Sequence, residues 1–205
     1  MRILLAHNSL YFPSHGGGDK SNRLLMEALA TKGHTVRVIA RMEQFGPEAH
    51  RDLLASLAGR DVVSRATEQA VVFTRDGVEV HTLTLSPHLR AYFSSQVREF
   101  DPDIILSSTD DPAQLLFDIA RRAPRARVVY LVRATIAVPF GPDSSLRNEE
   151  KTRALGDADG IVGVSEYVAD YVRKWSGMPA IHVPISLMEP GATSALGRFT
   201  NPFVT

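Results

Sequence analysis

Short runs of β-branched residues alternate along this chain with segments whose apolar positions recur at helical spacing. The runs predict strands at Arg2–Ala6, Thr35–Ala40, Asp103–Leu106, Arg127–Val132, Gly160–Val164 and Ala180–Val183. The segments between them predict helices at Asp19–Thr31, Pro47–Leu57, Pro87–Phe100, Pro112–Arg122 and Glu166–Trp175. Such alternation is typical of a parallel sheet with helices on both faces. We therefore expect an α/β fold of Rossmann type.

The first predicted helix carries an apolar stripe. Leu24, Leu25, Ala28 and Leu29 fall on one side of the helix, and Gly33 is placed to end it. Three of the later helices begin with proline, which a first turn tolerates because its amide has no acceptor within the helix.

One part of the chain departs from the parallel pattern. The apolar runs Ala70–Thr74 and Val78–Leu85 flank Asp76-Gly77, a pair of residues that favours a type I′ turn. We expect an antiparallel hairpin excursion here, at the edge of the sheet.

The Rossmann-like domain is expected to cover residues 1–185. From Ser186 onward the periodicity is lost, and the segment between Glu189 and Ser194 has the proline, glycine, serine and threonine content of a linker. Residues 203–205 read like the beginning of another strand. We expect residues 186–205 to be a linker or the start of a second domain that is missing from this chain.

The composition excludes several classes of protein. The chain has 205 residues, enough to bury the core of one ordinary domain. Its 23 basic and 23 acidic residues balance, so no net field draws it to nucleic acid or anionic lipid. It has no cysteine for disulfides, thiolate nucleophiles or metal sites. No apolar run reaches the length of a signal peptide or a transmembrane helix. We expect a soluble, cytoplasmic protein that handles small molecules.

A glycine-rich loop joins the first strand to the first helix. Gly16, Gly17 and Gly18 let the backbone pass close to a ligand, and the helix that follows offers unpaired amides that suit a phosphate. In an open parallel sheet the ligand crevice lies outside the carboxyl ends of the strands, where this loop begins. The alternative is an ordinary surface loop.

Two sharper motifs do not fit this loop. A P-loop would need glycines where the chain has Ser14 and Asp19, ahead of Lys20. A dinucleotide fingerprint would need a third glycine where Ser21 stands, and a much shorter loop. A nucleotide-dependent oxidoreductase is therefore a weaker hypothesis.

Further candidates follow the later strands at the same edge. Asp110 and Asp111 stand at the head of a predicted helix, where they either cap it or contact an acceptor. Arg133 follows the next strand, where it either holds an anionic ligand or pairs with one of those aspartates. Ser165 either caps the last helix or faces a ligand, and His15 belongs to the glycine loop.

Two Asp-x-Asp sequences raise the question of a metal site. Asp101-Pro102-Asp103 and Asp157-Ala158-Asp159 both precede strands, which places them at the amino edge of the sheet, away from the crevice. We expect a structural role for both and no metal site.

Two patches of sequence resemble the N-terminal domain of family 4 glycosyltransferases. The first patch comprises Met1–Leu5, Gly16–Asp19, Leu25–Ala30 and Lys32–Val38, and the second is Ala158–Val168. The resemblance spans roughly residues 1–185. It implies a GT-B fold, in which two Rossmann-like domains face each other and the first holds mainly the acceptor. It also implies a nucleotide-sugar donor, transfer with retention at the anomeric carbon, no cofactor and no essential metal.

The resemblance assigns roles to the candidate residues and also has limits. In such enzymes the glycine loop approaches the donor diphosphate and the acceptor, which implies that role for Gly16, Gly17 and Gly18. The other expected substrate-binding residues are His15, Asp19, Asp110, Asp111, Arg133 and Ser165. Family members often have a histidine where this chain has Arg133, and a proline-asparagine-glycine where it has residues 184–186. The family's glutamate pair and its basic residues for the donor belong to the second domain, so this chain alone is expected to be inactive. The alternative is a stand-alone, non-catalytic Rossmann-like binding domain.

Overall fold

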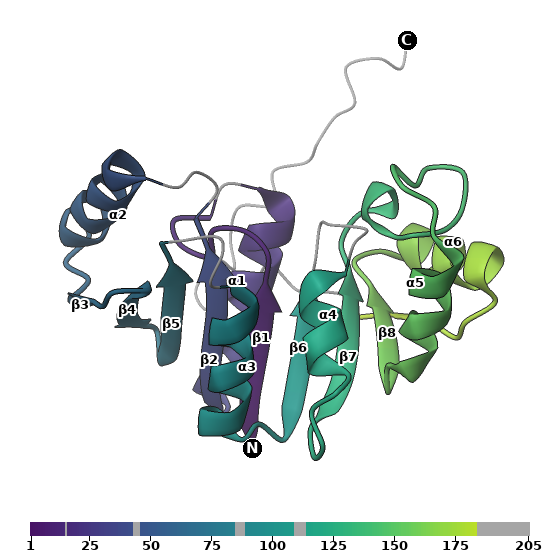
Figure 1. The fold of residues 1–205 in the computed structure, drawn as a ribbon, viewed down its shortest axis with the longest axis horizontal. Coiled ribbons are helices and arrows are strands. Elements are labelled where there is room, and N and C mark those ends of the chain that lie inside the picture. The colour runs from purple at the N-terminus through teal and green to yellow at the C-terminus, as the bar shows by residue number, and fades with distance from the viewer. Residues whose placement is uncertain (15, 43–45, 85–88, 109–113, 184–205) are drawn as a thin grey trace, which may run out of the picture.

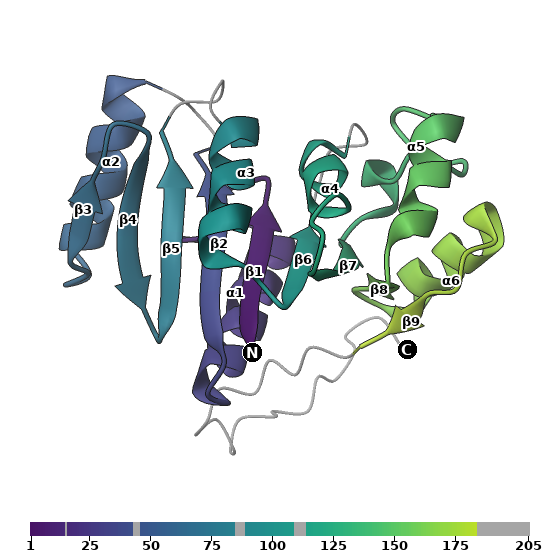
Figure 2. The same ribbon diagram turned by 60° about the horizontal axis from the view of Figure 1, so that its bottom comes forward.

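The structure is a computed structural model that describes residues 1–14, 16–42, 46–84, 89–108 and 114–183. In these ranges nine strands form one sheet, in the order β3-β4-β5-β2-β1-β6-β7-β8-β9 (Figures 1 and 2). The strands are β1 (Arg2–His7), β2 (Thr35–Arg41), β3 (Ser64–Ala66), β4 (Ala70–Arg75), β5 (Val78–Leu83), β6 (Ile104–Ser108), β7 (Arg127–Val132), β8 (Gly160–Gly163) and β9 (Ile181–His182). Every expected strand is present, with ends within about two residues of the prediction.

In the spatial order of the sheet, all neighbouring strands from β5 through β2 and β1 to β9 are parallel. Strand β4 is antiparallel to both of its neighbours, β3 and β5. The turn between β4 and β5 has φ of 50° at Asp76 and 77° at Gly77, and a type I′ turn needs positive φ at both positions. The antiparallel excursion at the sheet edge is therefore confirmed. The short outer strand β3 was not predicted.

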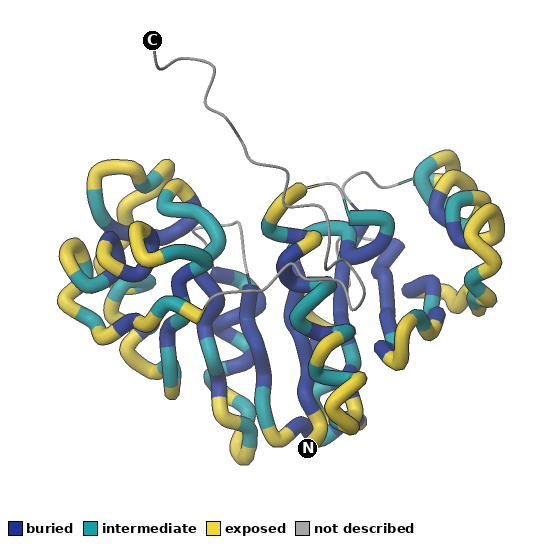
Figure 3. The backbone as a smooth tube through the Cα atoms, turned by 180° about the vertical axis from the view of Figure 1, so that it is seen from behind, coloured by how far each residue is buried: buried dark blue, intermediate teal, exposed yellow. Residues whose placement is uncertain are grey.

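Helices cover both faces of the sheet, as expected (Figure 2). They are α1 (Gly17–Thr31), α2 (Pro47–Ala58), α3 (Leu89–Phe100), α4 (Leu115–Ala120), α5 (Glu149–Ala154) and α6 (Glu166–Ser176), with short 3-10 turns η2 (Thr135–Ala137) and η3 (Leu155–Asp157). Two buried clusters form the core. One joins α1 and α2 to one face, and the other joins α3, α4 and α6 to the opposite face. Figure 3 shows the buried strands between helices whose outer sides are exposed.

The alternation of side chains along β1 produces these two clusters. Ile3 and Leu5 belong to the cluster under α1, whereas Leu4 and Ala6 belong to the cluster under α3. A strand that is buried on both faces reads as a continuous apolar run, which is why the sequence identified β1.

Helix α1 differs from its prediction in its start and in the stripe that it buries. It begins at Gly17, two residues earlier than expected. Ala28 is exposed, while Asn22 and Met26 are fully buried. The stripe that faces the sheet is therefore displaced toward Asn22 and Met26, and its first turns bring polar side chains to the carboxyl edge of the strands.

Two other helices also differ from expectation. Helix α4 ends at Ala120, before the predicted end at Arg122. The predicted starts of α3 and α4, at Pro87 and Pro112, lie outside the described residues. Helix α5 was not predicted. In the described part of the chain, no helix combines the length and the apolar character that crossing a membrane requires.

The order of the strands reverses direction at β1, in the middle of the sheet. The chain goes from β1 to β2 on one side, and β6 lies on the other side of β1. In open α/β sheets, such a reversal of direction marks the point where ligands bind, at the carboxyl ends of the strands. The carboxyl ends of β1, β6 and β7 form this edge.

Candidate functional site

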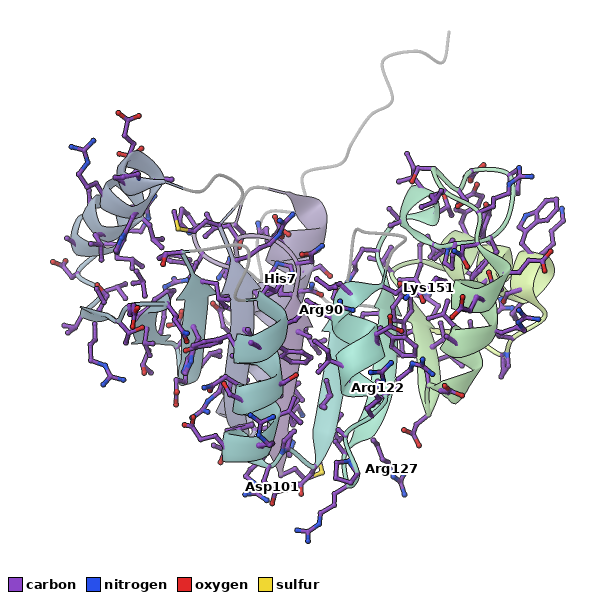
Figure 4. The ribbon with its side chains drawn as sticks, in the orientation of Figure 1. His7, Arg90, Asp101, Arg122, Arg127 and Lys151 are labelled. Atoms are coloured by element: carbon purple, nitrogen blue, oxygen red, sulfur yellow. The ribbon has the colours of Figure 1, made fainter. Side chains whose placement is uncertain are left out.

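The site lies where β1, β6 and β7 end. His7, the last residue of β1, pairs in register with Ser108, the last residue of β6, and Arg133 directly follows β7. Figure 4 places His7 at the upper end of the sheet and Asp101 at the opposite, lower end. The strand ends therefore bring together side chains that are far apart in the sequence.

The glycine loop forms the head of α1. Gly16 is the N-cap residue, and its amide donates a hydrogen bond to Asp19 Oδ2 at 3.2 Å. Gly17 and Gly18 are the first two residues of the helix, so their amides have no acceptor within it. A Cβ on Gly17 would meet no atom within 4 Å, so the space beside this residue is open. This geometry suits an anion.

Arg133 reaches the same helix head. Its Nη1 donates to Ser21 Oγ at 3.3 Å, and its Nη2 donates to Asn22 Oδ1. A Cβ on Gly18 would lie 3.6 Å from the Cβ of Arg133, so the arginine packs against the loop. The structure thus unites two predicted elements, a cationic side chain and a helix N-terminus. Both favour negative charge at one place.

Asp19 is held by hydrogen bonds behind the loop. Its Oδ1 accepts from Ser9 Oγ at 2.5 Å and lies 3.2 Å from His7 Nε2. Burial raises the pKa of this carboxyl group, but hydrogen bonds from His7, Ser9 and the Gly16 amide outweigh burial and lower the pKa to about 2. Asp19 is therefore ionised at neutral pH and fixes the conformation of Gly16.

The site residues expected from the sequence did not include five members of this network: His7, Ser9, Ser21, Asn22 and Ser108. Asn22 joins them, because its Nδ2 lies 2.9 Å from Ser108 Oγ and 3.1 Å from His7 Nδ1. A signal was present in the sequence, since Asn22 is a polar residue one helical turn before Met26 on the buried side of α1. Its partners come from other strands, and no local pattern connects them.

The remaining predicted residues are only partly described. Ser165 caps α6, because its Oγ accepts from the Val168 amide at 3.3 Å, so the capping hypothesis is confirmed. Contact of Ser165 with a ligand stays a prediction. His15, Asp110 and Asp111 lie outside the described residues, as does any pairing of the two aspartates with Arg133.

The two Asp-x-Asp sequences lie at the amino edge, as predicted, and have structural partners there. Asp103 Oδ2 accepts from the Arg2 amide at 2.7 Å, and Asp159 Oδ2 accepts from the Val128 amide at 2.7 Å. Asp101 forms an ion pair with the Arg2 guanidinium at 2.7 Å. These contacts tie neighbouring strands together. Within the described ranges, no group of three or more histidine or acidic side chains is arranged to hold a metal ion.

The fold and the helix head at its switch point define the class of this protein, a Rossmann-like α/β domain of the kind found in GT-B glycosyltransferases. The model of Glycosyltransferase Family 4 matches residues 15–185. The chain therefore belongs to glycosyltransferase family 4, and the resemblance seen in the sequence is confirmed.

Solved structures show the same fold at low sequence identity. The catalytic domain of starch synthase IV from Arabidopsis thaliana, bound to ADP and acarbose, aligns with a TM-score of 0.56 and 13% identity over 84% of this chain and 46% of its own. The α,α-trehalose 6-phosphate synthase from Burkholderia multivorans aligns with a TM-score of 0.51 and 12% identity over 89% and 48%. An apo structure of OtsA gives a TM-score of 0.50 and 13% identity over 83% and 42%.

This chain thus spans about half the length of the structures that it matches, with coverages of 46%, 48% and 42%. No functionally curated protein matches its sequence.

Proposed function

We propose that this chain is the acceptor-side half of a nucleotide-sugar-dependent glycosyltransferase that retains the configuration at the anomeric carbon. Membership of glycosyltransferase family 4 supports the reaction class. The observation that carries the assignment of the site is the contact of Arg133 with the head of α1, beside Gly18, at the switch point of the sheet.

In this proposal, the glycine loop and Arg133 act on the donor diphosphate. As the sugar leaves, negative charge develops on the diphosphate oxygens. The amides of Gly17 and Gly18 and the guanidinium of Arg133 stabilise that charge without having to reorient. Asp19 accepts a hydrogen bond from the Gly16 amide and so fixes the conformation of the N-cap residue. A metal ion is not essential for this task.

The acceptor is proposed to lie along the carboxyl ends of β6, β7 and β8. Asp110 and Asp111 follow β6 in the sequence, Ser165 follows β8, and His15 belongs to the glycine loop. Hydroxyl, carboxylate and imidazole groups are suited to hydrogen bonds with a hydroxylated acceptor. The donor is proposed to be a nucleoside diphosphate sugar, in keeping with the ADP bound in the starch synthase structure.

A second, donor-binding domain is proposed to complete the enzyme. The first domain of a GT-B enzyme supplies only one wall of the cleft, and the chain spans 46% of the starch synthase structure that it matches. Residues 186–205 are proposed to lead toward that domain. On this view the 205-residue chain alone does not turn over a donor.

The experiment uses the protein joined to its donor-binding domain. It is incubated with a panel of ADP-, UDP-, GDP- and dTDP-sugars and of sugar, lipid and aglycone acceptors, and release of the nucleoside diphosphate is measured. The proposal expects release from at least one donor and a product whose anomeric configuration, read by NMR, is that of the donor. An inverted product would overturn retention. Stoichiometric ligand binding without release from any donor would favour the non-catalytic binding domain.

A further inference from the structure

Asn22 is a fully buried amide that lies between a guanidinium and an imidazole. Its Oδ1 accepts from Arg133 Nη2, and its Nδ2 lies 3.1 Å from His7 Nδ1 and 2.9 Å from Ser108 Oγ. A guanidinium can only donate hydrogen bonds, so the Asn22 atom that faces Arg133 must be the oxygen. The orientation of the amide therefore follows from the chemistry of its neighbour.

This orientation determines where His7 carries its proton. Asn22 Nδ2 can only donate, so His7 Nδ1 must accept and cannot bear a hydrogen. On the other side of the ring, Nε2 lies 3.2 Å from the Asp19 carboxylate and 2.9 Å from Ser9 Oγ. An ionised carboxylate only accepts, so Nε2 carries the proton. His7 is thereby held as the neutral Nε2–H tautomer.

The hydrogen bonds then run in one direction through the buried site. Arg133 donates to Asn22, Asn22 donates to His7, and His7 donates toward Asp19 and Ser9. The chain of donors ends at Asp19, which accepts from Ser9 and from the amide of the glycine loop. Both ends of the network therefore contact the head of α1. Arg133 lies beside Gly18, and Asp19 accepts from the Gly16 amide.

We propose that Asn22 is the positioning residue of this site, and that it couples the orientation of the Arg133 guanidinium to the tautomer of His7. A second proton on His7 would sit on Nδ1, facing the amino group of Asn22. The amide would then have to turn, and turning would withdraw the oxygen that accepts a hydrogen bond from Arg133 Nη2. The part of the proposal that links Arg133 to the donor rests on the proposed function, whereas the tautomer of His7 does not.

The charged and titratable groups that face this pair come from α1, from β6 and from the segments that follow β1 and β7. Helix α1 presents the Asp19 carboxylate to Nε2, and the residue after β7 is the cation Arg133, beyond Asn22. The segment after β1 presents Tyr11, whose ring meets that of His7 edge-on with centroids 6.4 Å apart. Burial raises the pKa of the Tyr11 hydroxyl above its usual range, so it stays a neutral phenol. Of the described residues in β6, the group that faces the pair is a serine hydroxyl.

The first test reads the ring nitrogens of His7 by long-range proton–nitrogen NMR in the 205-residue chain at pH 7. The wild-type protein is expected to show a proton on Nε2 and none on Nδ1. Asn22→Asp keeps the shape but replaces the donor by an acceptor, and both ring nitrogens are then expected to be protonated. Asn148→Asp, which retains a good helix cap at α5, is the matched control and should leave His7 unchanged.

A wild-type His7 with a proton on Nδ1, or a ring unaffected by Asn22→Asp in a protein with an unchanged melting curve, would overturn the proposal. If Asn22→Asp does not fold, the wild-type tautomer alone decides, because a proton on Nδ1 is incompatible with the network.

The second test measures transfer in the protein joined to its donor-binding domain. Asn22→Leu removes the acceptor of Arg133 Nη2 and is expected to lower kcat/KM about tenfold, whereas Asn22→Gln, which keeps an amide, should recover part of the loss. If the NMR result holds while Asn22→Leu leaves kcat/KM unchanged, the coupling of Arg133 to transfer fails. If Arg133→Ala is also without effect, the fault lies in the proposed role of Arg133 at the donor and not in the network.

Discussion

Arg133 packs against Gly18 at the head of α1. A Cβ on Gly18 would lie 3.6 Å from the Cβ and 3.8 Å from the Cγ of Arg133, which are ordinary contact distances. The end of β7 and the glycine loop therefore form one continuous surface, although they come from distant parts of the chain. The proposed roles of both elements depend on this contact.

Gly17 provides a test of the open side of the loop. A Cβ there meets nothing within 4 Å, so Gly17→Trp should fold normally and place an indole where the donor diphosphate is proposed to bind. We expect transfer by the joined protein to be lost, with little change in melting temperature. Gly156→Trp is the control, because Gly156 is equally open but belongs to η3, which precedes β8 at the amino edge. Equal activity of the two variants would contradict the assignment of the loop.

The lowered pKa of Asp19 predicts that the folded protein loses stability at low pH. Its pKa is lowered from 3.8 to about 2 in the folded protein, so it stabilises the fold fully above pH 4 and loses this effect as the pH falls through 2. Allowing for solvent screening, the contribution is on the order of 1–2 kcal/mol. Denaturant unfolding between pH 5 and pH 2 should show a smaller loss of stability for Asp19→Asn than for the wild type. Parallel curves for the two proteins would show that the carboxylate is not held as described.

Gly163 tests the packing of α6 on the sheet. A Cβ at Gly163 would lie 2.6 Å from the backbone nitrogen of Ala169, whereas a Cβ at Gly160, in the same strand, would meet nothing within 4 Å. Gly163→Ala should therefore cost about 1–3 kcal/mol of unfolding free energy. Gly160→Ala should stay within about 0.5 kcal/mol of the wild type. If the two variants were equally stable in urea, α6 would not approach β8 as closely as the structure shows.

The aspartates at the amino edge are expected to act in stability and not in transfer. Asp159 accepts a hydrogen bond from the Val128 amide, so Asp159→Ala should cost about 1 kcal/mol of stability. Turnover by the joined protein should be unchanged by this substitution and by a metal chelator. Loss of activity on chelation, restored by a divalent cation, would refute a metal-independent mechanism.

The sequence predicted most of the fold because most elements leave a local pattern. Strands buried on both faces, such as β1, are continuous apolar runs, and the turn at Asp76-Gly77 has its own signature. β3 is short and polar, and it forms by pairing with β4, so it leaves no such pattern. Helix α5 has no buried residue and therefore no apolar stripe, although its cap, Asn148, was a readable signal.

The site was harder to predict, because its contacts are spatial. The position of Arg133 after β7 could be inferred from the rule that crevices lie at the carboxyl ends of strands. Its partners on α1 were not predicted, because the predicted apolar stripe of Leu24, Leu25, Ala28 and Leu29 did not include the polar residue Asn22. In the structure Asn22 is fully buried and contacts both His7 and Arg133.

The most direct test compares two arginines that lie at opposite ends of β7. Arg133 follows β7 at the proposed donor site, and Arg127 begins β7 at the amino edge, where Figure 4 shows it at the lower end of the sheet. In the joined protein, Arg133→Ala should reduce kcat/KM for transfer by roughly 10- to 150-fold, the effect of losing a charged contact of about 1.5–3 kcal/mol. Arg127→Ala should leave kcat/KM unchanged. Equal activity of the two variants would contradict a donor site at the carboxyl edge.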